Sequence, residues 1–268
     1  MSQTKLTLIG AGRMGSAMLG GWLSQGLKGQ IAVFDPNPTD DLKALSQKGD
    51  IVLNAPATPA ETLIIAVKPQ IFGSAVDMIR EHIGPQTKTL SIMAGVSLQT
   101  LEDRLQTTNV SRAIPNTPGL VGKGVTLTCF KPDTPETVRT YLSDLLRPLG
   151  AVEGPFEEDL LPAATAISGC GPAYGFLLAE VMAAAGEAHG IDPDLAQRLA
   201  CKTVEGAGAL MEASDDTAAT LRQNVTSPNG VTQAALEVLM RERAMPSLFR
   251  EAVEAAIARD RALNEETQ

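Results

Sequence analysis

The sequence contains few aromatic residues and few cysteines. Its 268 residues include six Phe, two Tyr, one Trp and three Cys. So few aromatic rings argue against a surface on which nucleic-acid bases stack. Cys129, Cys170 and Cys201 lie far apart, and such an odd, dispersed set predicts neither a disulfide framework nor a zinc site. We therefore expect no bound metal and a protein that works in the reducing cytoplasm.

The sequence also lacks a long hydrophobic run. Its first apolar run, Leu6–Ile9, leads directly into glycines, unlike the apolar core of a signal peptide. No later run approaches the roughly eighteen apolar residues that a membrane-spanning helix needs. The net charge is −9, which argues against broad nucleic-acid binding because such binding needs clustered cations. We expect neither a membrane nor a nucleic acid as a partner.

Charge and alanine are unevenly distributed along the chain. Residues 1–156 carry 14 basic and 13 acidic side chains, whereas residues 157–268 carry 8 basic and 18 acidic ones. The first part holds 12 alanines and the second part holds 24. Pro155 and Pro162 flank the change. The sequence therefore predicts two domains, 1–156 and 157–268.

The first part alternates short apolar runs with helical patterns. The expected strands are Lys5–Ile9, Ile31–Phe34, Leu63–Val67, Thr89–Met93, Val110–Ile114 and Val125–Phe130. Helices are expected at Met14–Gln25 and near 71–81, 97–105 and 135–147. This alternation is typical of an α/β fold with a doubly wound, mainly parallel sheet.

The second part contains no convincing strand. Helices are expected at Glu157–His189, Asp194–Ala213, Thr217–Gln223 and Thr232–Arg261. The many alanines would let helix axes approach closely, either within one chain or between chains.

A glycine motif follows the first strand. Gly10, Ala11, Gly12, Arg13, Met14 and Gly15 form the pattern GxGxxG between a strand and a helix. In this context the glycines allow a tight turn, close approach of a pyrophosphate and packing of the helix on the strand. An ordinary glycine-rich turn is the alternative. The motif predicts a dinucleotide site.

Asp35 ends the second strand. An acid at this place can accept hydrogen bonds from the ribose hydroxyls of the dinucleotide, which favours NADH over NADPH. The segment Pro36–Asp41 offers no cation for a 2′-phosphate before Lys43. The alternative is that Asp35 only forms a turn before Pro36.

Other strand ends carry candidate ligand residues. Ala66, Val67, Lys68 and Pro69 end one strand, Met93 and Ala94 end another, and Asn116 lies between two prolines after a third. Ligands of open α/β sheets bind at such carboxyl ends. A solvated lysine and a rigid turn without ligand are the alternatives for Lys68 and Asn116.

Two breaks interrupt the helical part. Ser168–Pro172 divides one helical run, and the polar loop Asn224–Thr232 precedes the last expected helix. Amide groups at such a helix start can bind a carboxylate, although a kink and a plain connector are the alternatives.

Taken together, Gly10–Gly15, Ala66–Pro69, Arg112–Pro118, Ser168–Tyr174 and Thr226–Thr232 closely resemble the motifs of pyrroline-5-carboxylate reductase. The resemblance implies a Rossmann domain followed by an all-α dimerisation domain, in a homodimer or a ring of dimers. It implies reduction of 1-pyrroline-5-carboxylate to L-proline, the last step of proline biosynthesis, with NADPH or NADH.

The resemblance also assigns roles to residues. Gly10–Gly15 would bind the pyrophosphate, and Ala66–Pro69 with Met93 and Ala94 would line the nicotinamide side. Asn224 resembles a family asparagine near the cofactor. The substrate loop would comprise Ser227, Gly230, Val231 and Thr232, with the Thr232 hydroxyl near the ring nitrogen as the catalytic group.

Three departures accompany the resemblance. Asn229 replaces a usual glycine, and because asparagine tolerates left-handed backbone we expect the loop to keep its shape. Cys170 replaces a smaller residue, and Asp35 makes the cofactor preference uncertain. His82 and His189 are expected on solvated or capping positions, so that no strong base is available.

Two other functions remain open from the sequence. A β-hydroxyacid dehydrogenase relies on a lysine early in its helical domain, but the segment from Ser168 to Glu187 contains none. A non-catalytic dinucleotide sensor would not need the carboxylate loop that Thr226–Thr232 resembles.

Overall fold

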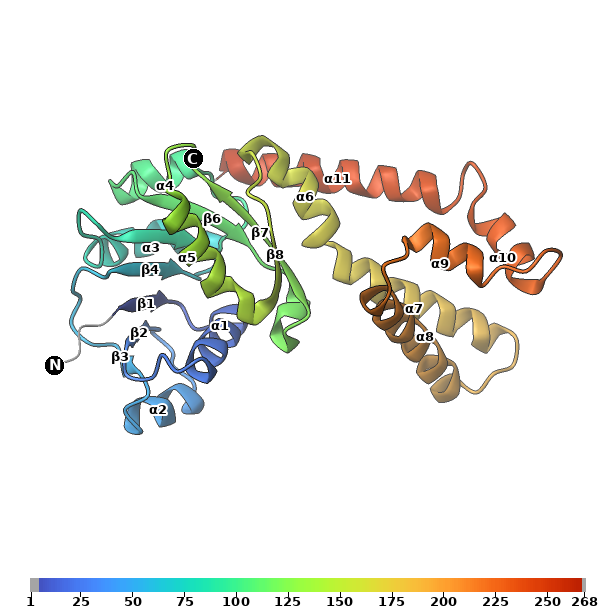
Figure 1. The fold of residues 1–268 in the computed structure, drawn as a ribbon, viewed down its shortest axis with the longest axis horizontal. Coiled ribbons are helices and arrows are strands. Elements are labelled where there is room, and N and C mark those ends of the chain that lie inside the picture. Colours follow the sequence, from blue (N-terminus) through green and yellow to red (C-terminus); the bar gives the residue numbers. More distant parts are fainter. Residues whose placement is uncertain (1–4, 267–268) are drawn as a thin grey trace. The chain divides into compact units, whose positions relative to one another are not determined.

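The computed structural model describes residues 5–266. Its first part holds an eight-stranded sheet in the order β3-β2-β1-β4-β5-β6-β7-β8 (Figure 1). The strands are β1 (Leu6–Ile9), β2 (Ile31–Phe34), β3 (Val52–Leu53), β4 (Thr62–Ile65), β5 (Lys88–Ser91), β6 (Val110–Ile114), β7 (Gly124–Phe130) and β8 (Gly150–Glu153). All neighbouring pairs are parallel except β6 and β7, which are antiparallel. The expected α/β sheet is confirmed.

Helices cover both faces of this sheet (Figure 1). The five helices are α1 (Arg13–Ser24), α2 (Asp40–Gln47), α3 (Pro69–Arg80), α4 (Leu98–Leu105) and α5 (Glu136–Leu146). Trp22 of α1 and Leu146 of α5 pack with Leu8 and Leu90 in one core cluster. On the other face, α3 and α4 pack against Leu63 and Ile65. Buried side chains on both faces explain why most strand residues are apolar, although β5 and β6 also bury Thr89, Ser91, Ser111 and Arg112.

Three elements of this part were not expected from the sequence. Strands β3 and β8 are short, and α2 was not among the expected helices. The Thr39 hydroxyl accepts a hydrogen bond from the Leu42 amide, and Asp40 and Asp41 occupy the first helical turn. This N-cap and the acids near the positive end of the helix stabilise α2 despite its polar start.

The second part is helical. It contains α6 (Leu161–Ser168), α7 (Gly171–Ala188), α8 (Pro193–Ala213), α9 (Ala218–Asn224), α10 (Val231–Leu239) and α11 (Met245–Glu266). Ala183, Ala196 and Ala200 form a small buried cluster, and a Cβ added to Gly186 would contact the Ala196 side chain at 3.4 Å. Small residues thus bring α7 and α8 close together, as expected.

The expected helix Thr232–Arg261 is divided in the structure. Helix α10 ends at Leu239 and α11 begins at Met245. Pro246 has no amide hydrogen and its ring excludes a continuous helix through the preceding turn. The prediction of one long helix was therefore wrong at this point, because Pro246 interrupts the apolar periodicity.

Packing divides the chain into two compact units. One comprises the described residues of Met1–Gly169 and Ala256–Gln268, and the other is Cys170–Ala255. Leu161 at the start of α6 is buried against Ile114, Leu127 and Cys129, which attaches α6 to the sheet. The expected division into 1–156 and 157–268 follows composition, whereas packing places α6 with the sheet.

Many apolar side chains of the helical unit are exposed. Examples are Phe176, Leu177 and Val181 of α7, which are 69%, 56% and 51% exposed. Among the described residues, one helical stretch, Glu158–Ala188, is long and apolar enough by composition to span a membrane. Only 11% of its most apolar window is buried within the chain. The exposed apolar face of α7 is therefore a candidate surface for contact with another protein chain.

Candidate active site

The glycine loop between β1 and α1 has the geometry of an anion-binding cradle. Gly10 has a φ of +90°, and a Cβ there would lie 2.9 Å from the Ala66 carbonyl oxygen. A Cβ on Gly15 would lie 2.3 Å from the Gly10 carbonyl oxygen, whereas one on Gly12 would have no atom within 4 Å. Glycine is thus required at positions 10 and 15 by packing, while Gly12 leaves open space for a ligand.

Within residues 5–266, two helices have a glycine as their N-cap residue and no side-chain cap. Gly12 precedes α1 and Gly230 precedes α10, and neither helix has an acid in its first turn. By contrast Thr39, Ser97, Asp192 and Thr217 cap α2, α4, α8 and α9. The first amides of α1 and α10 have no intrahelical acceptor, so both helix starts can bind an anion.

Asp35 is connected to the glycine loop. Its Oδ2 accepts a hydrogen bond from the Ala11 amide at 2.8 Å, and its Oδ1 accepts one from the Asn37 amide at 2.9 Å. Asn54, which has a φ of 49°, exchanges two hydrogen bonds with the Asp35 backbone. Asp35 is therefore a turn residue that also holds the cradle in place, and its role toward a ribose stays a prediction.

Other predicted cofactor residues share one edge of the sheet. Ala66 and Val67 follow β4 and are half-buried, and Lys68 is exposed at the N-cap of α3 with Pro69 in the first turn. Met93 is buried and Ala94 is exposed after β5. Since β1, β2, β4 and β5 are parallel, their carboxyl ends lie along the edge where the glycine loop begins.

Asn116 follows β6 and is buried. Its side-chain oxygen accepts from the Val125 amide at 2.8 Å, and its side-chain nitrogen donates to the Ser168 carbonyl at 2.8 Å. These bonds tie β7 and the end of α6 to the β6 turn. Asn116 thus has a clear structural function, and contact with a cofactor stays a prediction.

The predicted substrate loop precedes α10. Asn229 has a φ of 58°, as its replacement of a glycine required, and its amide donates to the Gln233 side chain at 2.8 Å. A Cβ on Gly230 would lie 2.4 Å from the Ser227 hydroxyl oxygen, so the turn is tight. Val231 is 90% exposed and Thr232 is half-buried. Asn224 is exposed at the end of α9.

No strong acid–base group accompanies these loops. The expectation that His82 is solvated was wrong: it is 1% exposed and packs on the Phe34 ring, and burial lowers its pKa. His189 is exposed, as expected, and its Nδ1 lies 2.9 Å from the Ala185 carbonyl oxygen. Burial raises the pKa of Cys129 to about 11, so this thiol is inert.

Among the described residues, neither a group of metal ligands nor the cavity described below competes with these loops as a candidate site. Within residues 5–266 no group of three or more His, Cys, Asp or Glu could hold a metal ion. A cavity of about 620 Å³ lies at the amino ends of the strands, next to Glu61, Lys88 and Val110. Ligands of open α/β sheets bind at the opposite, carboxyl edge. The starts of α1 and α10 therefore stay the candidate anion sites.

Two family models match the chain. One, described as pyrroline-5-carboxylate reductase dimerisation, matches residues 158–263. The other, described as NADP oxidoreductase coenzyme F420-dependent, matches residues 5–95. A pyrroline-5-carboxylate reductase of Pseudomonas aeruginosa is 33% identical over 271 residues, covering 99% of each chain. The chain belongs to the pyrroline-5-carboxylate reductase family.

Solved structures agree with this assignment. The pyrroline-5-carboxylate reductase of Coxiella burnetii has a TM-score of 0.88 at 28% identity, over 98% of this chain and 99% of that one. Pyrroline carboxylate reductase of Plasmodium falciparum, solved with NADP bound, has a TM-score of 0.79 at 27% identity, over the same shares. The pyrroline-5-carboxylate reductase family predicted from the motifs is confirmed, and its dimerisation domain is present.

Asn54 is a site residue that sequence reasoning missed. Its side chain fixes the backbone of Asp35 from the loop after β3. The only local signal was an asparagine next to a short apolar pair, which is too weak to predict a left-handed residue.

Proposed function

We propose that this chain reduces 1-pyrroline-5-carboxylate to L-proline with NADPH or NADH as the hydride donor. The observation that carries the proposal is the pair of uncapped, glycine-led helix starts at α1 and α10, in a chain of this family. The start of α1 suits a pyrophosphate, and the start of α10 suits the carboxylate of a small imino acid. This chain lacks the lysine on which a β-hydroxyacid dehydrogenase relies, and a non-catalytic dinucleotide sensor needs no second anion site.

The glycine loop and the start of α10 bind different parts of the reactants. The amides of Arg13, Met14 and Gly15 bind the pyrophosphate, and Gly12 leaves room for it. When bound, the reduced nicotinamide supplies a hydride to C5 of the substrate. The amides at the start of α10, beginning with Val231 and Thr232, hold the substrate carboxylate. A protonated imine is already electrophilic, so orientation contributes most of the catalysis.

Thr232 is placed to orient the substrate nitrogen. Within the described residues its hydroxyl forms no hydrogen bond, and its side chain is half-buried in the first turn of α10. A hydroxyl is too weak an acid to donate a proton alone, so it would position the ring nitrogen or a water that protonates it. The product nitrogen takes up one proton for each hydride that C5 accepts.

A second copy of the chain would cover the exposed apolar face of α7. The dimerisation model matches residues 158–263, which include Phe176, Leu177 and Val181. A homodimer, or a ring of such dimers, removes this area from water and makes a lipid environment unnecessary. The three free cysteines suit the reducing cytoplasm.

The activity assay decides between the functions. Purified full-length chain, mixed with 1-pyrroline-5-carboxylate and NADPH or NADH, should consume the reduced nicotinamide and form proline in equal amounts. A β-hydroxyacid with NAD or NADP should give no reduction. If neither reduced cofactor is consumed by a folded chain that still binds it, the protein is a sensor and the proposal is wrong.

Replacing Thr232 with alanine should lower kcat by about tenfold to a hundredfold. This range corresponds to a hydrogen bond to a charged group, worth about 1.5–3 kcal/mol. Stability should change little, because the hydroxyl has no partner in the described part of the chain. Thr232→Ser keeps the hydroxyl and should retain most activity. Equal kcat values for Thr232→Ala and the parent chain would remove the hydroxyl from the mechanism.

A further inference from the structure

The charge of Asp35 does not by itself exclude a 2′-phosphate. An acid at the end of β2 selects NADH when its carboxylate is free to accept ribose hydroxyls and repel a phosphate. Here each carboxylate oxygen already accepts a backbone amide, from Ala11 and from Asn37. These two donors stabilise the negative charge locally and fix the carboxylate in the turn. Asp35 keeps its negative charge, so a 2′-phosphate at this place needs a cation to offset that charge.

Arg13 supplies a cation within the glycine loop. It is the first residue of α1, two positions after Ala11, whose amide binds Asp35. Its side chain is exposed and has neither a hydrogen bond nor an ion pair within the part of the chain that the structure describes. Lys43, the next cation after β2, is engaged with Asp40 at 2.9 Å. The planar guanidinium group of Arg13 suits two hydrogen bonds to a phosphate.

We propose that Arg13 binds the 2′-phosphate of NADPH and so determines the cofactor preference of this chain. The proposal rests on the proposed function only in that it places the dinucleotide on the glycine loop. Arg13 attracts the phosphate and Asp35 opposes it, so the chain uses NADPH at least as well as NADH. The preference for NADH was expected from the charge of Asp35 alone, whereas the proposal also includes the opposite charge of Arg13.

Calorimetric titration of the full chain with 2′,5′-ADP and with 5′-AMP isolates the 2′-phosphate. Arg13→Gln should weaken binding of 2′,5′-ADP by about tenfold to a hundredfold, the loss expected for one charge-assisted contact. Binding of 5′-AMP should change less than about twofold. Lys43→Gln removes a nearby cation of the same charge and should leave both affinities unchanged.

Three results would overturn the proposal. An equal loss for both ligands would assign Arg13 to the 5′-phosphate side, and no loss for either ligand would leave Arg13 as a solvated residue. A loss in Lys43→Gln as large as in Arg13→Gln would reduce the effect to general electrostatics. All three readings come from binding alone, so they stand whether or not the chain turns over.

Kinetics then connect the binding result to the reaction. The ratio of kcat/KM for NADPH to that for NADH should fall in Arg13→Gln by about the same factor as the affinity for 2′,5′-ADP. Asp35→Ser should raise this ratio, because it removes the opposing charge. A folded parent chain without turnover on either cofactor would refute the reductase function and leave the assignment of Arg13 untouched.

Discussion

Gly15→Ala should nearly abolish NAD(P)H binding and lower the free energy of unfolding by about 1–3 kcal/mol, the usual cost of overpacking. The added Cβ would lie 2.3 Å from the carbonyl oxygen of Gly10 and 3.3 Å from its carbonyl carbon. Both are backbone atoms, and a Cβ on Gly10 would itself lie 2.9 Å from the Ala66 backbone, so the loop cannot yield locally. We expect the dissociation constant to rise by about two orders of magnitude, since several amides lose their alignment with the pyrophosphate.

Gly20→Ala is the matched control in the same helix. A Cβ there would have no atom within 4 Å, and alanine stabilises a helix interior relative to glycine by up to about 1 kcal/mol. This variant should bind NADPH as the parent does, and its midpoint of unfolding should lie at a slightly higher urea concentration. If both variants bind equally well, Gly15 does not set the geometry of the cradle.

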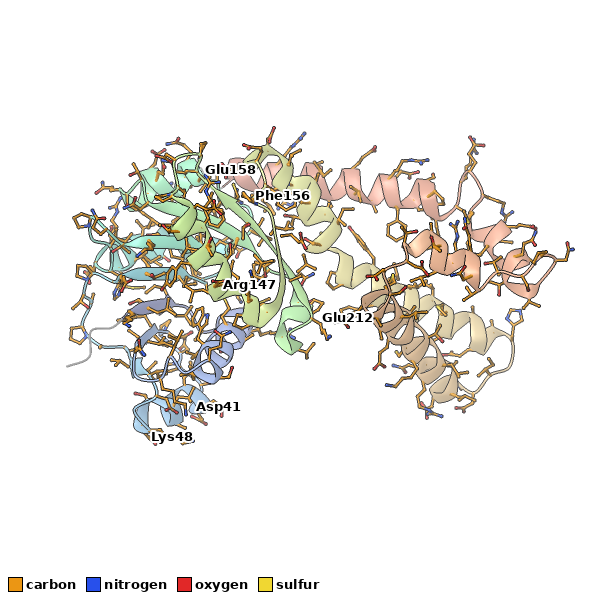
Figure 2. The ribbon with its side chains drawn as sticks, viewed as in Figure 1. Asp41, Lys48, Arg147, Phe156, Glu158 and Glu212 are labelled. Atoms are coloured by element: carbon orange, nitrogen blue, oxygen red, sulfur yellow. The ribbon has the colours of Figure 1, made fainter. Side chains whose placement is uncertain are left out.

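Glu158→Ala should lower the free energy of unfolding by about 3 kcal/mol, near the lower end of the range for a broken buried ion pair. The Arg112 side chain is only 4% exposed, and its Nη1 lies 2.5 Å from Glu158 Oε1. The same oxygen accepts the Leu98 amide at 2.7 Å, at the start of α4. Figure 2 labels Glu158 next to Phe156, where the chain leaves the sheet. The substitution leaves the buried Arg112 cation without its ion-pair partner. It also leaves the Leu98 amide, at the start of α4, without its acceptor.

Asp144→Ala provides the comparison for an exposed pair. Asp144 and Arg147 lie 2.7 Å apart, but their side chains are 55% and 65% exposed (Figure 2 labels Arg147). Such pairs contribute at most about 1 kcal/mol. Urea unfolding of both variants measures the difference. A loss in Glu158→Ala no larger than in Asp144→Ala would mean that water reaches Arg112.

The sequence predicted those parts of the fold that local patterns control. Strand β2 has the expected bounds because it is an apolar run between turn residues, and β6 also has the expected bounds although it contains Ser111 and Arg112. The two-residue strand β3 is defined by its neighbour β2, which no local pattern reports. Pro246 divided the last helix against its periodicity. His82 is buried by the Phe34 ring, a contact between residues far apart in sequence.

In the candidate site, too, local sequence patterns were predictable and contacts between distant residues were not. The glycine loop was predictable, since strand, glycines and helix are consecutive. The left-handed Asn229 was predictable from its place in the motif. The partners of Asp35 and Asn116 were not, because Ala11 and Ser168 are brought to them only by the folded sheet. Those partners change the chemistry of Asp35 and give Asn116 a structural role.

The alanine contact between α7 and α8 has a consequence for how the chain folds. Its buried cluster consists of Ala183, Ala196 and Ala200, with Ala179 beside it. Alanine removes little apolar area from water, so this small core contributes little of the free energy that ordering two long helices requires. In the proposed dimer the larger side chains of α7 supply the remainder. Folding of this unit and association of two chains are then one event, whose equilibrium depends on protein concentration.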